Sequence, residues 1–417
     1  GYLEANGDQC EKCSEMFDPT DIINPKSTIT GSSIEIKEVE HLFLDLKKLS
    51  PELKKWILAQ KQWRRQVSSL ALGWIKEGLL PRCITRDLKH GVSVPLKGFE
   101  DKVFYVWFDA PIGYVTATKE ARPKDWEEFW KNKETKTYQF LGKDNIPFHT
   151  LFWPGAIMAQ GEFNLPYQVV GLQYLNYEGG KFSKSKKHGV FCEKLPELDL
   201  EADIWRAYLT QIIPETSDSE FKWKEFAERI NSDILGNLGN FYNRVFTFIK
   251  NKFDGSIKKP KYLEFDAKDK ELIASLEKRG AKITEYLEAT EIRKAFFEIL
   301  ALSSDGNKYF NDCEPWKVIK KNPDEANRRL YLCANLARAL SIFISPFMPS
   351  IAEKAWKQIG LKGNVNDDGN WDSFSKIDLE KFSLGEIKIL FKQIKDEDIE
   401  KYKEVVSNGI ELEDLFN

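Results

Sequence analysis

The chain has 417 residues, which exceeds the size of one ordinary hydrophobic core, so we expect two to four domains. Its composition is 42% apolar and 30% charged, as in soluble globular proteins, and no apolar run approaches membrane-spanning length, so no membrane partner is expected. The net charge of −3 excludes a protein-wide basic field, so any nucleic acid must bind through local patches and shape. The six cysteines are scattered apart from one pair, which favours a reducing cytoplasmic compartment over a disulfide framework.

The paired cysteines are Cys10 and Cys13, in a Cys-x-x-Cys motif that begins just after a Gly-Asp turn. Tetrahedral zinc needs four ligands, and this pair supplies half of a zinc knuckle. The next cysteine is Cys83, so no second pair follows. Either the partner pair precedes residue 1 or the two cysteines no longer bind Zn²⁺, and both readings stay open. The chain also starts without methionine, and we expect that it is cut there.

The region that follows reads as an inserted domain. Two β-like stretches, Thr28–Ile36 and His41–Leu46, precede one amphipathic helix. Ser50 is the expected N-cap of that helix, Pro51 lies in its first turn, and Gly78 ends it.

Three apolar segments then predict a parallel α/β arrangement. Val103–Phe108 is nearly continuously apolar, as in strands buried on both faces. Tyr138–Leu141 and the strand beginning at Tyr167 flank a helix expected from about Ile146 to Gln160, which makes a βαβ unit. In open α/β sheets, ligands bind beyond the carboxyl ends of the strands.

The loops at these strand ends carry candidate chemistry. The string from Trp107 to Tyr114 offers aromatic walls around small residues, or it is simple strand-end packing. Asp144 either accepts hydrogen bonds from ribose hydroxyls or an ammonium group, or N-caps the next helix. His149 is either a site residue or a packed histidine.

A lysine loop follows the last strand: Lys181-Phe182-Ser183-Lys184-Ser185, directly after two glycines. Two lysines three residues apart on a hinged loop can close over a polyphosphate and neutralise the charge of a departing pyrophosphate. Lys186, Lys187 and His188 extend the positive patch. The alternative reading is a solvated basic loop.

Beyond the lysine loop the pattern becomes helical and predicts an α-bundle. The expected helices are Ala202–Ile212, Phe221–Phe253 (either kinked or two joined helices), Asp266–Leu287, Glu291–Phe310, Asp324–Ser345 and Ser350–Ile359.

Taken in order, these strings resemble the class I methionyl-tRNA synthetases, whose signature loop is written KMSKS. The resemblance rests on the WFDAPIGY string that starts at Trp107, the GKD…FH string that starts at Gly142, and the lysine loop, and it extends over essentially the whole chain. Phe182 replaces the usual methionine of the signature, while the charges at Lys181 and Lys184 remain.

The resemblance implies a role for each matching residue. Lys181 and Lys184 would stabilise pyrophosphate, and Asp144, with Gly142, would lie near the ribose of ATP and the amino acid's ammonium group. Arg86 would lie near the active site. The implied methionine pocket consists of Trp107, Ala110, Pro111, Tyr114 and His149.

The bundle would read the tRNA anticodon through Asn240, Arg244 and Trp316. Asn240 and Arg244 are four residues apart and share one helical face, from which they can reach base edges, while Trp316 can stack on a base. The alternative is that Trp316 is a core residue at a proline-initiated helix.

The implied fold is α/β plus all-α, with four segments. They are a connective-peptide domain with the partial knuckle (1–99), the second half of a Rossmann-type catalytic domain (100–178), the signature loop with a stem-contact segment (179–222) and an α-helical anticodon-binding domain (223–417). The implied substrates are L-methionine, ATP with Mg²⁺, and tRNA(Met), including the initiator.

One family feature is absent from the sequence. The HIGH-type motif, whose histidines contact ATP phosphates, has no H-x-G-H counterpart here; the histidines are His41, His90, His149 and His188. We expect that a segment before residue 1, or a separate N-terminal polypeptide, supplies it, and that the chain is inactive alone. The alternative is a catalytically silent tRNA-binding protein derived from a synthetase.

Overall fold

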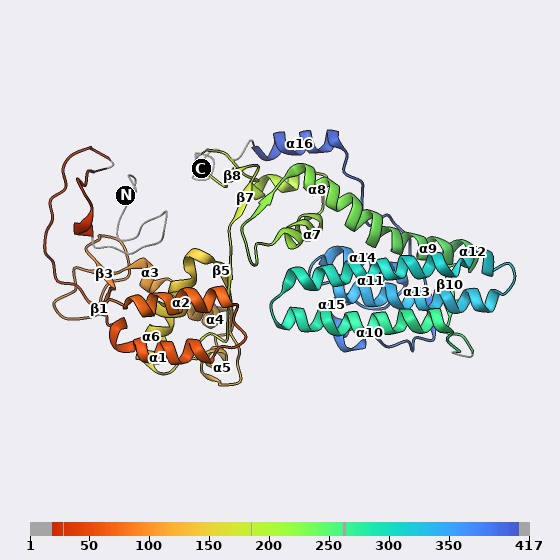
Figure 1. Cartoon of the computed structure of the whole chain (residues 1–417), viewed down its shortest axis with the longest axis horizontal. Helices are drawn as coiled ribbons and strands as arrows, with labels where there is room; N and C mark the ends of the chain where they lie inside the picture. Colours follow the sequence, from red (N-terminus) through yellow and green to blue (C-terminus); the bar gives the residue numbers. More distant parts are fainter. Residues whose placement is uncertain (1–18, 28, 185, 262–263, 408–417) are drawn as a thin grey trace. The chain divides into compact units, whose positions relative to one another are not determined.

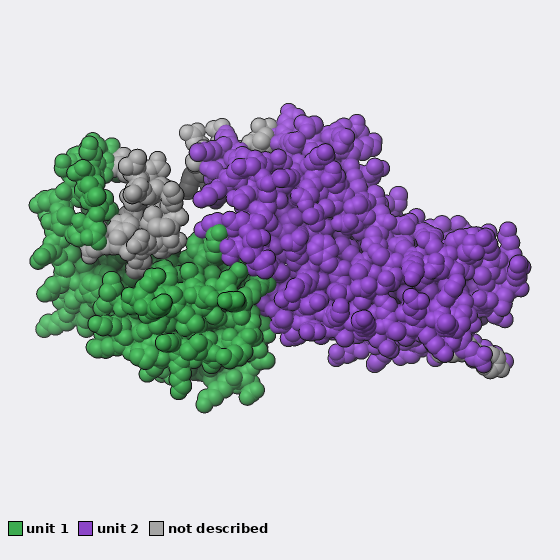
Figure 2. Space-filling model, in the orientation of Figure 1, with its two compact units in different colours: residues 1–172 green, residues 173–417 purple. Residues whose placement is uncertain are grey.

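The computed structural model describes residues 19–27, 29–184, 186–261 and 264–407. The chain divides into two compact units, Gly1–Leu172 and Gln173–Asn417, shown in different colours in Figure 2. The four-segment division expected from the sequence is finer than this one and stays a prediction.

The first unit contains short strands and mostly short helices, labelled in Figure 1. Its helical elements are η1 (Pro19–Asp21), α1 (Leu46–Ala59), α2 (Arg65–Glu77), α3 (Val106–Asp109), α4 (Ile112–Ala121), α5 (Trp126–Lys131), η2 (Lys143–Asn145), η3 (Phe148–Phe152) and α6 (Trp153–Gln160). Its strands are β1 (Phe43–Leu44), β2 (Arg82–Cys83), β3 (Thr85–Arg86), β4 (Val103–Phe104), β5 (Tyr138–Gly142) and β6 (Gln168–Leu172).

The single helix predicted between Ser50 and Gly78 is wrong, because two helices occupy that stretch. Helix α1 starts earlier, since the carboxylate of Asp45 accepts a hydrogen bond from the amide of Lys48 at 3.1 Å and caps the helix. The chain then turns back at residues 60–64, where the rings of Trp56 and Trp63 pack edge to face with centroids 5.0 Å apart. The predicted end of the second helix at Gly78 is confirmed, with a φ of 101°.

The two predicted N-terminal strands are also largely wrong. Only Phe43–Leu44 forms a strand, which pairs antiparallel with Arg82–Cys83. The described part of the earlier stretch has a single bridge, between Lys26 and Ser33. Its apolar side chains, such as Ile34, are exposed, so the alternation in this sequence does not mark a buried face.

The apolar run Val103–Phe108 is not the buried parallel strand that was predicted. Val103–Phe104 pairs antiparallel with Thr85–Arg86, and the chain then turns into α3. Helical geometry turns Val106 outward, where it is 62% exposed. A short apolar run cannot by itself separate a strand from a helical turn, which explains the error.

The predicted βαβ unit is confirmed. Strands β5 and β6 pair in parallel with Tyr138 opposite Gln168, and the crossover between them is helical. Gly171 lets this crossover pack closely on the strands, because a Cβ at this position would lie 2.6 Å from the Ile146 side chain. The carboxyl end of β5 therefore delivers the chain directly into η2 and η3.

The second unit is a helical bundle with small β-pairings at its edges (Figure 1). Its helical elements are η4 (Cys192–Glu197), α7 (Ala202–Ile212), α8 (Trp223–Arg229), η5 (Ile230–Gly239), α9 (Asn240–Lys252), α10 (Ala267–Glu288), α11 (Ile292–Cys313), α12 (Pro315–Val318), α13 (Pro323–Ile344), α14 (Pro349–Ile359), α15 (Val365–Asp368), η6 (Trp371–Ser373) and α16 (Asp396–Ser407). Its strands are β7 (Leu175–Tyr177), β8 (Gly180–Lys181), β9 (Ser219–Phe221), β10 (Ser256–Lys258) and β11 (Lys381–Ser383).

The bundle helices were predicted well. Helix α7 has the predicted bounds, and α10, α11, α13 and α14 agree to within a few residues. Asp266 and Asp269 form a capping box at the start of α10. The stretch predicted as one kinked or two joined helices is continuous, with α8 leading through η5 into α9.

The middle of that continuous stretch, η5, is a π-helix of 10 residues. Its glycines allow close packing: a Cβ at Gly239 would lie 2.7 Å from the Phe391 ring. Long π-helical segments are rare and are frequently found at functional sites.

Among the described residues, no helix combines the length and apolar character that crossing a bilayer requires.

Candidate functional site

The first candidate cluster lies at the end of the apolar run in the first unit. Trp107, on α3, is 49% exposed. Its ring packs on that of Phe148, on η3, with centroids 4.8 Å apart. The Phe148 side chain is buried and gives this aromatic pair a fixed base. Half of the indole thus remains open to a ligand.

Tyr114 and His149 form the polar part of the same cluster. The hydroxyl of Tyr114 lies 2.9 Å from Nε2 of His149, and Nδ1 of His149 lies 3.0 Å from the backbone oxygen of Asn145. A carbonyl oxygen can only accept, so Nδ1 carries the proton and Nε2 accepts from the tyrosine. Burial lowers the pKa of His149, although its bond to Asn145 opposes this, and the ring is neutral at pH 7.

Ala110 and Pro111 form the turn that joins α3 to α4. The amide of Ala110 donates to the carbonyl of Val106 at 2.7 Å, and the amide of Tyr114 donates to that of Pro111 at 3.2 Å. These two small residues therefore set the spacing between the Trp107 and Tyr114 side chains. The five predicted pocket residues lie on α3, α4, the intervening turn and η3.

Asp144 follows β5 in the short helix η2 and is exposed. A Cβ at Gly142 would lie 2.7 Å from its carboxylate, so a larger residue there would displace the Asp144 side chain from this position. Neither η2 nor η3 has a side-chain cap, so the alternative reading of Asp144 as a helix N-cap is wrong. Its carboxylate remains exposed beside Asn145, whose backbone orients His149.

Arg86 lies on β3 and stacks on an aromatic ring. Its guanidinium carbon is 3.8 Å from the centroid of Tyr105, the residue that precedes α3, and its Nη1 donates to the backbone of Thr85 at 2.9 Å. Planar stacking of this kind fixes the direction of a guanidinium group. Arg86 is thereby held next to the start of α3.

The lysine loop belongs to the second unit and is a tight hairpin that begins at β8. Ser183 and His188 exchange backbone hydrogen bonds of 2.9 and 3.0 Å. Nε2 of His188 donates to the carbonyl of Tyr177 at 2.8 Å, which ties the hairpin to β7. Lys181 and Lys184 are both exposed, and neither forms an ion pair with a described carboxylate. Ser185 lies outside the described residues.

The predicted anticodon residues lie on one face of the bundle. Asn240 starts α9, and its Nδ2 donates to Oδ1 of Asn307, on α11, at 3.2 Å. One turn later, Nη2 of Arg244 donates to Oδ1 of Asn311 at 2.6 Å. Asn240 also lines a groove of about 930 Å³, formed with the segment 387–393 of the same unit.

Trp316 belongs to the same face rather than to the core. It is 38% exposed, so the alternative reading of a core residue is wrong. Its ring packs against Phe310 with centroids 6.0 Å apart, and Phe310 also lies under the guanidinium of Arg244, at 4.6 Å. The buried Phe310 therefore supports two of the three predicted base-contacting side chains, Arg244 and Trp316.

Sequence reasoning missed the α11 side of this face, namely Asn307, Phe310 and Asn311. Asn307 and Asn311 are four residues apart, as Asn240 and Arg244 are on α9. That matched spacing was the available signal.

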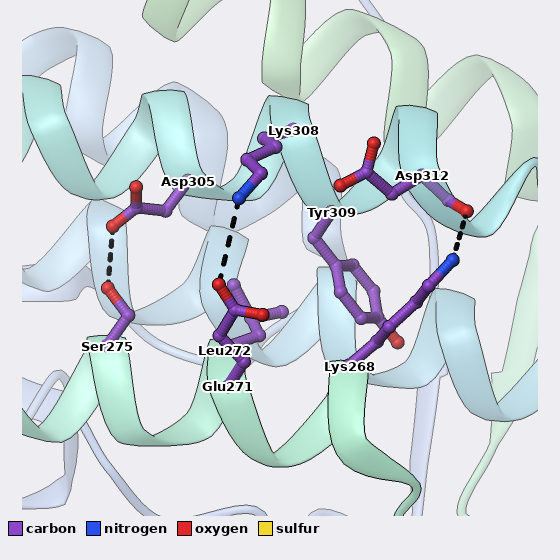
Figure 3. Close-up of a pocket in the computed structure, with 8 residues that line it drawn as sticks. All are labelled: Lys268, Glu271, Leu272, Ser275, Asp305, Lys308, Tyr309 and Asp312. Carbon is purple, nitrogen blue, oxygen red and sulfur yellow. Dashed lines mark hydrogen bonds and ion pairs between the residues drawn. The ribbon is translucent and has the colours of Figure 1, made fainter.

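A small cavity of about 120 Å³ between α10 and α11 is a poor candidate site. Figure 3 shows that several of its polar side chains bind one another or the backbone. Ser275 donates to Asp305 at 2.6 Å, Lys268 donates to the carbonyl of Asp312 at 2.7 Å, and Lys308 lies 3.7 Å from Glu271. The three lysine and serine side chains named here are thus already bonded within the cavity.

Cys10 and Cys13 lie outside the described residues. Within the described part of the chain, no group of three or more His, Cys, Asp or Glu side chains could hold a metal ion.

Two family models match the chain. The model described as "tRNA synthetases class I (M)" matches residues 1–246. The model described as "Anticodon binding domain of methionyl tRNA ligase" matches residues 260–410. The first match contains the pocket cluster and the lysine loop, and the second contains α11 and Trp316.

Curated relatives agree with these matches. A methionine–tRNA ligase from Sulfolobus acidocaldarius is 37% identical over 422 residues, which cover 99% of this chain and 73% of the relative. One from Treponema denticola is 40% identical over 436 residues, covering 98% of this chain and 55% of the relative. The chain thus spans little more than half of the Treponema protein.

A solved structure shows the same fold. Methionyl-tRNA synthetase from Mycobacterium tuberculosis in complex with methionyl-adenylate is 25% identical, with a TM-score of 0.77 that covers 90% of this chain and 74% of that one. This likeness confirms the expected fold class, a Rossmann-type α/β part followed by an all-α bundle. The chain belongs to the methionyl-tRNA synthetase family of class I aminoacyl-tRNA synthetases.

Proposed function

We propose that this chain takes part in a methionine–tRNA ligase reaction. In it, L-methionine reacts with ATP to give methionyl-adenylate and pyrophosphate, and the methionyl group then passes to tRNA(Met), including the initiator. The observation that carries the proposal is the cluster of Trp107, Tyr114 and His149, in a family whose Mycobacterium member is described as a methionyl-adenylate complex.

In the first step, the methionine carboxylate attacks the α-phosphorus of ATP, and pyrophosphate leaves in line. Catalysis of such transfers consists mainly of positioning and charge stabilisation. Lys181 and Lys184, exposed on the hairpin, neutralise the leaving pyrophosphate, and Mg²⁺ accompanies ATP and shares that charge. Asp144, at the carboxyl end of β5 beside Gly142, binds the ammonium group or the ribose.

The pocket selects methionine by its shape and neutrality. Trp107 and Phe148 supply an aromatic surface on which a thioether packs favourably. The pKa of His149 is lowered by burial, so no charge faces the apolar side chain at pH 7. Arg86, stacked on Tyr105, provides a cation near the start of α3 for the reacting anions.

The bundle recognises the anticodon. Asn240 and Arg244 present polar groups to base edges, and Trp316 stacks on an unpaired base, which are the usual means of single-stranded RNA recognition.

We assign the connective-peptide, catalytic, stem-contact and anticodon roles to residues 1–99, 100–178, 179–222 and 223–417. We place the reaction in the cytoplasm, as favoured by the free thiols of the four described cysteines.

Activation by these residues alone is expected to be inefficient, because the sequence holds no H-x-G-H motif. We propose that a polypeptide carrying that motif completes the site, and that Cys10 and Cys13 contribute two thiolates to a zinc knuckle. Zinc content measured with and without that polypeptide tests the second point.

The test of the function is methionine-dependent ATP–pyrophosphate exchange, by the chain alone and with the HIGH-containing N-terminal half of a relative added. Exchange should appear only in the mixture, and Lys181→Ala and Lys184→Ala should each lower it at least about 100-fold, the scale of a lost transition-state contact. Lys186→Ala, in the same loop, is the matched control and should retain activity. Exchange by the chain alone would contradict the incomplete site. No exchange in the mixture, with anticodon-dependent tRNA binding intact, would identify a catalytically silent relative.

A further inference from the structure

We propose that Asn307 is a positioning residue for RNA recognition. It fixes the side-chain amide of Asn240 with its oxygen outward, so that Asn240 accepts a hydrogen bond from the exocyclic amino group of an unpaired base. The inference rests on the proposed anticodon reading by Asn240 and names the residue that sets the polarity of that contact.

The orientation of the Asn307 amide is dictated by backbone carbonyls. Its Nδ2 donates to the carbonyl of Asn237 at 3.0 Å and lies 3.3 Å from that of Ser303. A carbonyl oxygen can only accept a hydrogen bond. A flipped Asn307 would place its own oxygen against both acceptors, and an unmade bond at a half-buried polar group is costly.

Asn237 reinforces the same polarity. Its Nδ2 donates to the carbonyl of Leu300, on α11, at 2.8 Å. Its Oδ1 is therefore the atom that faces Asn307, and it accepts from Nδ2 of Asn307 at 3.3 Å. The direction of both amides thus follows from main-chain groups.

The fixed orientation of the Asn307 amide also orients the side chain of Asn240. Since Nδ2 of Asn307 is held by Asn237, Oδ1 of Asn307 faces α9 and accepts from Nδ2 of Asn240 at 3.2 Å. The amide nitrogen of Asn240 is thereby directed toward α11. Its Oδ1 makes no hydrogen bond with any described residue, and the side chain is exposed.

Close packing of α9 on α11 holds the hydrogen-bonded amides of Asn237, Asn307 and Asn240 in place. Gly306, next to Asn307, faces Phe241, next to Asn240; a Cβ on Gly306 would lie 2.7 Å from the Phe241 ring and 2.6 Å from Leu336. Helices α9 and α11 therefore approach closely here, which brings these short amide side chains within hydrogen-bonding range.

The order of hydrogen-bond acceptor and donors that Asn240 and Arg244 expose indicates which bases they can bind. Asn240 offers an acceptor, and one turn later Arg244, stacked on Phe310 and bound to Asn311, offers donors only. Cytosine and adenine carry an amino donor beside a ring-nitrogen acceptor, which complements this order. Uracil and guanine carry a carbonyl beside an N–H and oppose it.

The experiment measures binding of the chain to tRNA(Met) with the anticodon CAU and to two altered tRNAs, with UAU and CGU. The first alteration exchanges the amino group of cytosine for a carbonyl, and the second exchanges the 6-amino group of adenine for a carbonyl and adds a 2-amino group. Wild type should lose at least about tenfold in affinity for one of the two. Asn307→Leu removes the amide at similar size, so the Asn240 amide can turn either way. The ratio of the affinities for the CAU tRNA and the altered tRNA should then fall to within about threefold.

A structural role alone would not change that ratio. Asn307→Asp keeps an acceptor toward Asn240, but its second oxygen faces the carbonyls of Asn237 and Ser303 and it adds negative charge, so stability and affinity for all tRNAs should fall while the ratio of affinities persists. In an Asn240→Ala background, Asn307→Leu should leave the ratio unchanged. Circular dichroism checks folding, and Asn307→Ala replaces the leucine variant if that one is unfolded.

The outcomes separate the two proposals. Equal binding of all three tRNAs by wild type would refute anticodon reading itself, and this inference with it. Discrimination by wild type that Asn307→Leu retains would overturn the inference alone. Loss of the ratio in the leucine variant with retention in the aspartate variant would establish the positioning role.

Discussion

The hydroxyl of Tyr114 donates a hydrogen bond to Nε2 of His149 across 2.9 Å, while Nδ1 of the same ring donates to the backbone of Asn145. The imidazole is thus held at both nitrogens in a single neutral tautomer. Burial opposes protonation of the ring and outweighs the bond to Asn145, which favours the protonated form, so the pKa of His149 is lowered.

The first prediction concerns pH. The folded-state pKa of His149 lies below its ordinary value of 6.5, so the unfolded chain binds more protons as the pH falls below about 6.5. This contribution to stability is full above that pH and is lost as the pH falls toward the folded-state pKa. The slope is at most about 1.4 kcal/mol per pH unit for one proton. Urea unfolding between pH 7.5 and 5 should show this loss in wild type but not in His149→Gln; parallel profiles would contradict it.

The second prediction concerns Tyr114→Phe. The variant leaves Nε2 of His149 without its donor, but Tyr114 is 46% exposed, so water can replace the hydroxyl and the loss of stability should stay below about 1 kcal/mol. The disturbed pocket should raise the KM for methionine in the reconstituted exchange reaction by about three- to tenfold. Tyr138→Phe, in the same unit, is the control and should change neither quantity. An unchanged KM would separate Tyr114 from the pocket.

The third prediction concerns the buried ion pairs at the start of α10. Asp269 is fully buried, pairs with Arg329, and accepts from the hydroxyl of Tyr309 at 2.6 Å. Asp269→Ala would remove the buried one of the three carboxylates that pair with Arg329, besides Asp266 and Glu325, and would leave the Tyr309 hydroxyl without its acceptor, which should cost about 3 kcal/mol. The exposed pair Lys224–Glu228 is the comparison, since Glu228→Ala should cost less than about 0.5 kcal/mol. Denaturant unfolding measures both, and similar losses would argue against a dominant buried pair.

The fourth prediction compares two glycines. Gly306→Ala places a methyl group 2.6 Å from Leu336 and 2.7 Å from Phe241, and overpacking of this kind should cost about 1–3 kcal/mol. Gly73→Ala, inside α2, meets nothing within 4 Å and should be neutral or stabilise its unit by up to about 1 kcal/mol. Scanning calorimetry that resolves the two units gives both values. A stable Gly306→Ala variant would mean that α9 and α11 can separate without cost.

Elements that depend on local sequence were predicted correctly, and elements that depend on contacts with distant segments were not. Helix α7 was predicted with its bounds because its periodicity and flanking residues are local. Helix α10 was predicted to within one residue at each end, and the structure shows a local capping box at its start, at Asp266. The apolar run Val103–Phe108 failed because its fate depends on contacts with β3 and η3, which no local pattern records.

Site residues that belong to short sequence motifs were also predicted, whereas a residue defined by distant contacts was missed. Trp107, Tyr114 and His149 were predicted from family strings, and the structure places Trp107 on Phe148 and Tyr114 on His149. Asn307 was missed because its importance lies in hydrogen bonds to Asn237 and Asn240, some 70 positions away in the sequence. The four-residue spacing of Asn307 and Asn311 indicates a shared helical face, but the hydrogen bonds that give Asn307 its role join it to another segment of the chain.

The π-helical segment η5 acts as a rotational offset within one continuous helix. Each residue of an α-helix advances the chain by about 100° around the axis, so one residue more or fewer between α8 and α9 would turn every later side chain by that angle. Deleting a single residue from η5 would carry Asn240 and Arg244 away from α11 together, without changing either. The length of this segment therefore sets which side chains of α9 meet the amides of α11.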